Sequence, residues 1–230
     1  MDESKSFVRG FHHFRECPDG GLLTSVYLDH CRGKCKSFCD GCFLAEHPVG
    51  IDETERGAYT PDELIAYLKR EKELCFSRPL EIHFTGGEPL ADPWYCVHVA
   101  RALKADGMRV SFRSCGNITA THLLVVKDVA DHFLFDFLTV IPSVHRRITG
   151  FPLDRALDAL HLADRAKLPY RVRLRVLPGV NDKDPVVFAA FFRTLHEIKS
   201  VSLDFSKSGL SEEDVRAYRC AFLNEGVVLF

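Results

Sequence analysis

From residue 60 onward, runs of alternating apolar residues and runs of helical periodicity take turns, with Gly and Pro between them. This pattern is typical of repeated strand–helix units that build a parallel sheet or barrel. The predicted strands cover residues 22–28, 80–85, 108–114, 133–139, 171–177, 201–205 and 227–230. The predicted helices cover residues 61–74, 93–105, 119–130, 154–166, 185–197 and 211–225. Six or seven units are fewer than the eight of a closed barrel. The sequence therefore predicts an α/β fold, an open partial (β/α)6 TIM-like barrel of parallel strands.

The composition indicates one soluble globular domain over residues 1–230, since 46% of the residues are hydrophobic and 27% are charged. A formal net charge of -2 gives no electrostatic footprint for nucleic acid or an anionic membrane. The first residues lack the apolar core of a signal peptide, and no run approaches the roughly 20 apolar residues of a membrane helix. We expect a cytoplasmic protein, in which nine cysteines favour metal binding over disulfides.

A long loop at about residues 29–59 follows the first predicted strand and carries a cluster of thiols, at Cys31, Cys35, Cys39 and Cys42. The last three are spaced i, i+4, i+7, so they would share a face if helical. Three thiolates can bind three irons of a four-iron, four-sulfur cube and leave the fourth iron open. Four ligands, with Cys31 or His47 as the fourth, would instead suit a zinc knuckle. The spacing alone does not decide between these two metals.

The second predicted strand ends in Gly86-Gly87-Glu88. Adjacent glycines let backbone carbonyls approach a ligand's ammonium group, and Glu88 adds a charge-assisted acceptor. An ordinary tight turn is the alternative interpretation. In parallel α/β folds, ligands bind at the carboxyl ends of strands. We expect the cysteine loop, this segment, Ser114 and the Pro178-Gly179 turn to lie on one rim for that reason.

Cys35-x3-Cys39-x2-Cys42 after the first strand, followed by Gly-Gly-Glu-Pro after the second, resembles the radical S-adenosylmethionine enzymes. The resemblance implies a single radical SAM domain with a [4Fe-4S] cluster on these three cysteines, whose open iron chelates S-adenosylmethionine. Reductive cleavage then gives a 5'-deoxyadenosyl radical that abstracts hydrogen. The chemistry belongs to the cluster and cofactor, so no further catalytic residue is implied.

Within that family the chain is similar to the activating enzymes of glycyl-radical enzymes, such as those of pyruvate formate-lyase and anaerobic ribonucleotide reductase. The matching features are Phe43 after the third cysteine, the segment from His145 to Gly150, and Arg173 in the strand before Pro178-Gly179. The resemblance implies an oxygen-sensitive, anaerobic oxidoreductase. Its substrate would be a glycine on a partner protein, and its electron would come from flavodoxin or ferredoxin.

Two departures from the activating-enzyme pattern concern the predicted cofactor site. The usual lysine after Asp136 is missing, and Arg113-Ser114 stands where these enzymes often have Asp-Thr. We hypothesise that Arg113 supplies a positive charge paired with Asp136; solvent exposure of Arg113 is the alternative. Two other functions stay open. One is a radical SAM enzyme that modifies a small molecule or peptide, and the other is a non-enzymatic zinc or iron–sulfur protein.

Some remaining residues fit structural roles. Cys17 and Cys31 are too few for a second cluster, and Cys75, Cys96 and Cys220 lie in predicted helices, where core packing is expected. The adjacent His12 and His13 would point to opposite faces of a strand. Asp136 interrupts an apolar strand and therefore needs a partner or ligand.

Overall fold

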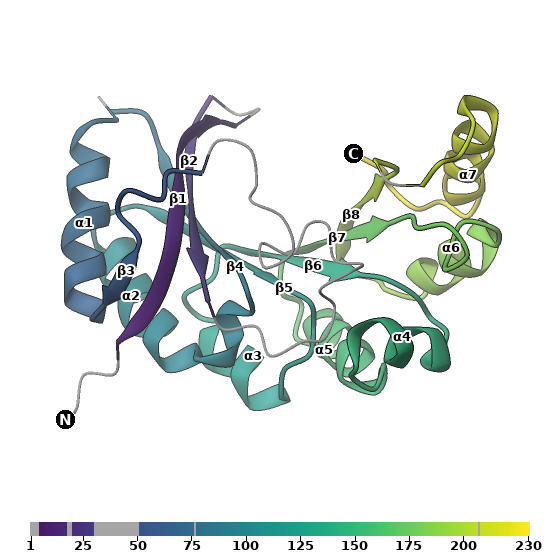
Figure 1. Cartoon of the computed structure of the whole chain (residues 1–230), viewed down its shortest axis with the longest axis horizontal. Coiled ribbons are helices and arrows are strands. Elements are labelled where there is room, and N and C mark those ends of the chain that lie inside the picture. Colours follow the sequence, from purple (N-terminus) through teal and green to yellow (C-terminus); the bar gives the residue numbers. More distant parts are fainter. Residues whose placement is uncertain (1–4, 18–19, 30–50, 76, 207) are drawn as a thin grey trace. The chain divides into compact units, whose positions relative to one another are not determined.

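The computed structural model describes residues 5–17, 20–29, 51–75, 77–206 and 208–230. The chain divides into two compact units (Figure 1). Unit 1 comprises Met1–Ser114 and Thr121–His132, and unit 2 comprises Cys115–Ala120 and Phe133–Phe230. In the part of the chain so described, no helix is both long and apolar enough to cross a membrane.

Unit 1 is built on five strands in the order β3-β1-β2-β4-β5. Their bounds are β1 Ser6–Glu16, β2 Leu22–Leu28, β3 Gly57–Tyr59, β4 Leu80–Gly86 and β5 Arg109–Ser114. The central strands β2, β4 and β5 run parallel, as predicted. Strands β1 and β3 are additions to the predicted pattern, and β1 runs antiparallel to both β2 and β3.

The helices of unit 1 are α1 Pro61–Glu73, the 3-10 helix η1 Pro89–Ala91, α2 Pro93–Ala105 and α3 Ala120–Val126, which starts at the border of the unit. Two of them, α1 and α2, begin and end close to their predicted bounds, α3 ends four residues before the predicted residue 130, and the short η1 was not predicted. The predicted capping box opens α1: Thr60 accepts a hydrogen bond from the Glu63 amide, and the Glu63 side chain accepts one from the Thr60 amide. Asp92 caps α2 in the same position before a proline.

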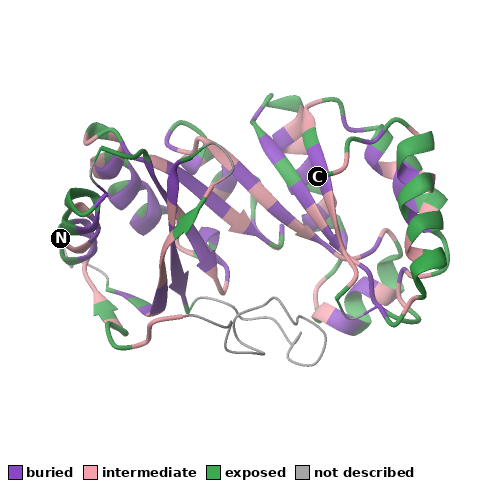
Figure 2. Ribbon diagram, turned by 90° about the horizontal axis from the view of Figure 1, so that it is seen from above, coloured by how far each residue is buried: buried purple, intermediate pink, exposed green. Residues whose placement is uncertain are grey.

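The core of unit 1 lies between its strands and α1. One row of the sheet, which crosses four neighbouring strands, consists of Phe11, Val26, Phe84 and Phe112. All four are fully buried, and buried residues follow the central strands in Figure 2. The Phe11 ring stacks on Tyr67 of α1 with centroids 4.6 Å apart, which identifies this apolar face as the helix-covered one. Adjacent residues of a strand face opposite sides, so the neighbouring row faces away from α1.

Unit 2 contains three parallel strands in the order β6-β7-β8. The strands are β6 His132–Phe137, of which His132 belongs to unit 1, β7 Tyr170–Arg175 and β8 Ile198–Asp204. The helices are α4 Pro142–Thr149, α5 Asp154–Arg165, α6 Pro185–Arg193 and α7 Glu212–Asn224. Helix α4 was not expected. The predicted last strand is reduced to a single parallel bridge between Val201 and Leu229.

Six of the strands described are parallel to a neighbour, and helices connect most of them in sequence. This matches the count of strand–helix units in the sequence. Among the described residues, neither set of strands closes into a barrel. The predicted α/β class, with parallel strands in an open arrangement, is therefore confirmed.

Candidate functional site

The carboxyl end of β4 lies against the carboxyl end of β2. The Gly87 amide donates a 2.7 Å hydrogen bond to the carbonyl oxygen of Leu28, the last residue of β2. Gly86 has a φ of +95°, and a Cβ there would lie 2.6 Å from both the amide nitrogen and the carbonyl oxygen of Leu28. Only glycine fits this close backbone approach. The packing of the two strands is thus sufficient to require Gly86, before any ligand is considered.

Glu88 joins the ends of β4 and β5. It is buried, with 5% of its surface exposed. One carboxylate oxygen accepts a 3.2 Å hydrogen bond from the Leu90 amide, and the other accepts a 3.0 Å bond from the Ser114 hydroxyl. Gly86, Glu88 and Ser114, all predicted as cofactor-binding residues, are therefore gathered at one edge of unit 1. The expectation that carboxyl ends of neighbouring strands bring these residues together is correct for this group.

The cysteine motif, which precedes Gly86 in the sequence, lies outside the part of the chain that the structure describes. Strand β2 ends at Leu28 beside Gly86, and the chain continues from Asp29 into the cysteine loop. The predicted metal ligands Cys35, Cys39 and Cys42, together with Phe43, lie outside the described residues. Within the described ranges, no group of three or more His, Cys, Asp or Glu side chains has a metal-binding arrangement.

Asp136 has the partner that its apolar strand required. In unit 2, Nε of Arg173 lies 2.8 Å from Oδ1 of Asp136, and the two residues are register partners on β6 and β7. These two predicted site residues are thus adjacent. The hypothesis that pairs Arg113 with Asp136 stays a prediction, because Arg113 belongs to unit 1.

The turn after β7 is organised by Asn181, which the sequence interpretation did not single out. Its side-chain amide donates 2.7 Å hydrogen bonds to the carbonyls of Leu138 and Arg175, and its Oδ1 accepts one from the Leu177 amide. The signal was present in the sequence: an asparagine inside a Pro-Gly turn is well suited to bond the surrounding backbone. Asn181 fixes the backbone that follows β6 and β7.

His145, which the family resemblance also brought forward, is buried in α4 of unit 2. Its Nδ1 lies 3.1 Å from the carbonyl oxygen of Phe151, which accepts the Nδ1 proton. Thr149 donates to the backbone carbonyl of His145. This geometry anchors the end of α4 to the chain beyond Gly150.

The remaining cysteines are divided between core and surface. Cys75 and Cys96 are buried, as expected, and burial raises the pKa of both thiols. Cys220 is exposed, so its predicted place in the core is wrong. Cys220 lies on the solvent-facing side of α7, whereas Tyr218 and Phe222 are the buried residues of that helix.

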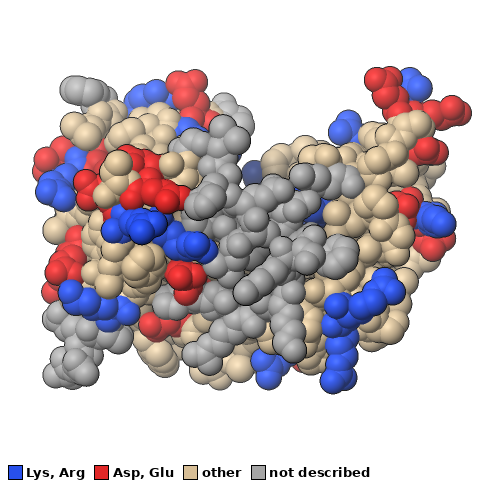
Figure 3. Space-filling view, viewed as in Figure 1, with Lys and Arg blue, Asp and Glu red and all other residues tan. Residues whose placement is uncertain are grey.

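Comparison with protein families decides the class. The model described as "Radical SAM superfamily" matches residues 31–192, which begin at the cysteine cluster and include the Gly86–Glu88 edge. The chain belongs to the radical SAM superfamily. On the face shown in Figure 3, its described acidic and basic side chains are interspersed, in agreement with the small net charge.

Curated relatives of this radical SAM chain are named as activating enzymes. The isethionate sulfite-lyase activating enzyme of Desulfovibrio desulfuricans is 27% identical over 132 residues, which are 54% of this chain and 41% of that protein. The enzyme of the same name from Nitratidesulfovibrio vulgaris is 23% identical over 165 residues, covering 70% of this chain and 52% of that protein. The alignments thus span about half of these relatives' lengths. The expected similarity to activating enzymes is confirmed.

Solved structures show the same fold. A domain of a pyruvate-formate lyase-activating enzyme from Bacteroides vulgatus has a TM-score of 0.59 and 19% identity, covering 64% of this chain and 96% of that one. QueE from Escherichia coli has a TM-score of 0.62 and 13% identity, covering 98% and 92%. At these identities the likeness concerns the fold alone.

Proposed function

We propose that this radical SAM chain is an enzyme that activates a glycyl-radical enzyme. The observation that carries the proposal is the family match over residues 31–192 together with curated relatives named as activating enzymes. The reaction would be abstraction of a hydrogen atom from a glycine of the partner protein. The curated relatives are named as activating enzymes of three different lyases or sulfolyases, so the identity of the partner is not part of the proposal.

The described residues fit S-adenosylmethionine in the chemistry of their donors and acceptors. Its amino group is a cation, and Glu88 places a buried carboxylate at the carboxyl end of β4. Leu90 and Ser114 hold that carboxylate in one orientation. A charged acceptor that is already ordered and desolvated binds an ammonium group at a low entropic cost. We assign Glu88 to this amino group, with Gly86, Gly87 and Ser114 beside it.

The metal ligands in this proposal are Cys35, Cys39 and Cys42, which would hold a [4Fe-4S] cluster. That cluster, when reduced, supplies the electron for cleavage of S-adenosylmethionine to methionine and a 5'-deoxyadenosyl radical. The residues of this chain bind and orient the cosubstrate. Arg113, Asp136, Arg173 and Phe43 remain candidates for the rest of the cofactor. A flavodoxin or ferredoxin as reductant, an anaerobic setting and a cytoplasmic location complete the proposal, since such a cluster needs reduced thiolates.

Anaerobic reconstitution of the chain with iron and sulfide tests the proposal. We expect about four irons per chain and formation of 5'-deoxyadenosine after reduction. Cys35→Ala, Cys39→Ala and Cys42→Ala should each lose the cluster, whereas Cys31→Ala and the exposed Cys220→Ala should keep it. One zinc per chain, lost on Cys31→Ala, would contradict the enzyme and support the zinc knuckle.

The activating role needs a second measurement. The reduced protein is incubated with S-adenosylmethionine and with glycyl-radical enzymes of the classes that the relatives activate, and electron paramagnetic resonance follows the glycyl radical. A radical on one of these partners supports the proposal. Cosubstrate cleavage without a radical on any of them would instead favour a small-molecule or peptide substrate.

A further inference from the structure

A second row of the unit 1 sheet is polar across four strands. Its members are register partners from β1 to β5, namely His12, Ser25, His83 and Ser111. Each is the sequence neighbour of a residue in the apolar row, so this row lies on the opposite face, away from α1. Ser25 and Ser111 are almost fully buried, whereas His83 is half-buried. Parallel strands covered on both faces are usually apolar throughout, so a polar row indicates a ligand-facing surface.

A chain of hydrogen bonds sets the proton on the His83 ring. The Ser111 hydroxyl lies 2.6 Å from Oε1 of Glu81 and 2.8 Å from Nδ1 of His83. A carboxylate only accepts, so the single serine proton is donated to Glu81. The serine oxygen must then accept from His83, which places the ring proton on Nδ1. The other ring nitrogen, Nε2, carries a lone pair.

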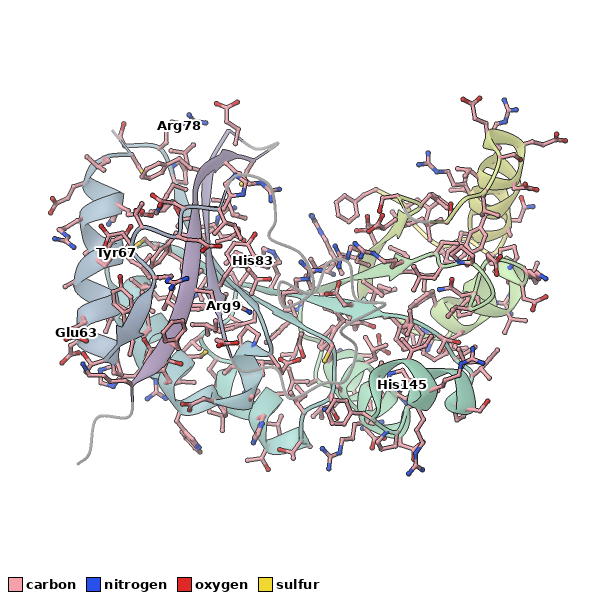
Figure 4. All side chains as sticks on the ribbon, viewed as in Figure 1. Arg9, Glu63, Tyr67, Arg78, His83 and His145 are labelled. Carbon is pink, nitrogen blue, oxygen red and sulfur yellow. The ribbon has the colours of Figure 1, made fainter. Side chains whose placement is uncertain are left out.

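That lone pair has no partner in the protein as described. Among the described residues, the His83 ring makes its side-chain hydrogen bond through Nδ1, to Ser111, and Nε2 is not one of the fully buried polar atoms that lack a partner. In Figure 4, His83 lies on the side of β1 and β2 away from α1. His83 therefore presents an oriented acceptor on the polar face.

The charges around His83 keep it neutral and define what it can bind. Burial, followed by the positive charges of Arg113, His132 and Arg15, lowers the pKa of His83 to about 3. Glu81 is the acid in contact with this row, and it is engaged by Arg109 at 3.6 Å and His132 at 3.5 Å. A cationic donor would be repelled by the neighbouring arginines. The matching donor is thus a neutral N–H or O–H group.

We infer that Nε2 of His83 accepts a hydrogen bond from a main-chain N–H of the substrate segment that carries the reacting glycine. His83 is then a substrate-binding residue, and Ser111 and Glu81 are positioning residues that hold its tautomer. The inference rests on the proposed function, because that function supplies a peptide as substrate. A peptide amide is the neutral donor that such a segment offers at every residue.

Two substitutions of His83 separate this role from a structural one. In His83→Asn, the side-chain amide can replace Nδ1 and donate to Ser111, but nothing replaces Nε2. In His83→Gln, the amide oxygen can reach the place of Nε2 and accept in its stead. A ligand role predicts that glutamine is the better replacement. A role limited to satisfying Ser111 predicts that asparagine is better.

The probe is a panel of capped seven-residue peptides with a central dideuterated glycine, incubated with the reconstituted, reduced enzyme and S-adenosylmethionine. Mass spectrometry measures deuterium in 5'-deoxyadenosine, expressed per cosubstrate cleaved so that cluster loss does not distort the comparison. We expect His83→Asn to raise the KM for peptide about tenfold, which is the effect of losing one hydrogen bond. His83→Gln should raise the KM no more than about threefold, because its amide oxygen restores an acceptor. The exposed His98→Asn serves as a control that leaves the KM unchanged.

Peptides methylated at one amide at a time give a second, independent readout. One methylation should impair the wild-type enzyme about tenfold and add little to His83→Asn, because both changes remove the same hydrogen bond. Equal KM values for wild type and His83→Asn, or asparagine outperforming glutamine, would overturn the inference. Cosubstrate cleavage without deuterium transfer from any peptide would also overturn it. A wild-type protein that forms no 5'-deoxyadenosine would overturn the proposed function as well.

Discussion

At the scale of single residues, Gly86 shows how one motif can meet two needs. The sequence predicts either a ligand contact or a tight turn for the Gly-Gly-Glu segment, and the structure adds that the close backbone of Leu28 alone requires Gly86. A sequence pattern cannot separate these reasons, because the close approach depends on how β2 and β4 pair. Glu88 differs from Gly86 because no backbone collision requires it: its buried carboxylate, which is costly to desolvate, accepts hydrogen bonds from Leu90 and Ser114.

Gly86→Ala should lower the free energy of unfolding by about 3 kcal/mol, because a positive φ and a backbone collision act together. Gly107→Ala is the matched control: Gly107 also has a positive φ of +78°, but a Cβ there meets nothing within 4 Å. Its cost should be about 1 kcal/mol. Urea unfolding of both variants gives the comparison, and equal losses would show that the approach to Leu28 is not tight.

The sequence predictions do not include the polar row, although its alternation is present in the sequence. Glu81 and His83 alternate in a predicted strand, and Ser111 follows in the next one, so a polar face could have been inferred from period 2. What the sequence does not contain is the register. Only the pairing of His83 with Ser111 shows that the two side chains meet, and a shift of one residue would move Ser111 to the other face.

At the scale of helices and strands, the repeated units were predicted well because periodicity, caps and breakers agree there. Predicted and observed bounds coincide for α2 and differ by one residue for α1 and β4. Strand β1 was missed because its alternation is interrupted. Phe14 has a φ of 52°, and the register with β2 shifts between His12 and Arg15. Such a bulge changes which residues share a face.

The contact between β1 and α1 should make stability depend on pH. His13 pairs with the buried Glu71 of α1, and this hydrogen bond raises the pKa of His13 above 6.5. The stabilisation from protonated His13 is therefore complete below pH 6.5 and is lost as the pH rises through the pKa of the folded state. The difference in Tm between wild type and His13→Gln should shrink from pH 6 to pH 9. His98→Gln is the control, because His98 pairs with Asp62 on the exposed surface, where an ion pair contributes little to stability. A constant difference would contradict this assignment.

The turn after β7 should depend strongly on Asn181. Asn181→Ala leaves the carbonyls of Leu138 and Arg175 and the amide of Leu177 without their partner, and we expect a loss of about 3 kcal/mol. Asn181→Asp keeps the acceptor but turns a carboxylate toward two carbonyl oxygens, so it should destabilise at least as much. The exposed Asn224→Ala should change stability by no more than about 0.5 kcal/mol. Chemical denaturation of the three variants tests this order.

At the scale of the whole molecule, the family match and the local geometry answer different questions, namely which class of enzyme the chain belongs to and how its candidate cofactor residues are held. The family match identifies the class, and the paired ends of β2, β4 and β5 give Glu88 its setting. The sequence motifs, namely the cysteine spacing together with Gly-Gly-Glu, were enough to predict the family, whereas the assignment of Cys35, Cys39 and Cys42 as metal ligands stays a prediction. The choice of substrate does not follow from these motifs, because it depends on surfaces that strand pairing creates from residues far apart in sequence.

Binding of S-adenosylmethionine should stabilise the whole folded chain through Glu88. A ligand at 100 times its Kd that binds only the native state adds about 2.7 kcal/mol, or roughly 5–10 °C in Tm for a chain of this size. The reconstituted protein should show this shift, and the protein without iron should not.

Glu88→Gln should weaken S-adenosylmethionine binding about tenfold, because it removes a charged, buried acceptor while an amide oxygen still accepts from Leu90. At the same ligand concentration the shift in Tm should therefore fall by about half. Glu212→Gln, at the exposed start of α7, should keep the full shift. Calorimetry with and without the cosubstrate measures all three proteins, and an undiminished shift in Glu88→Gln would remove Glu88 from the binding site.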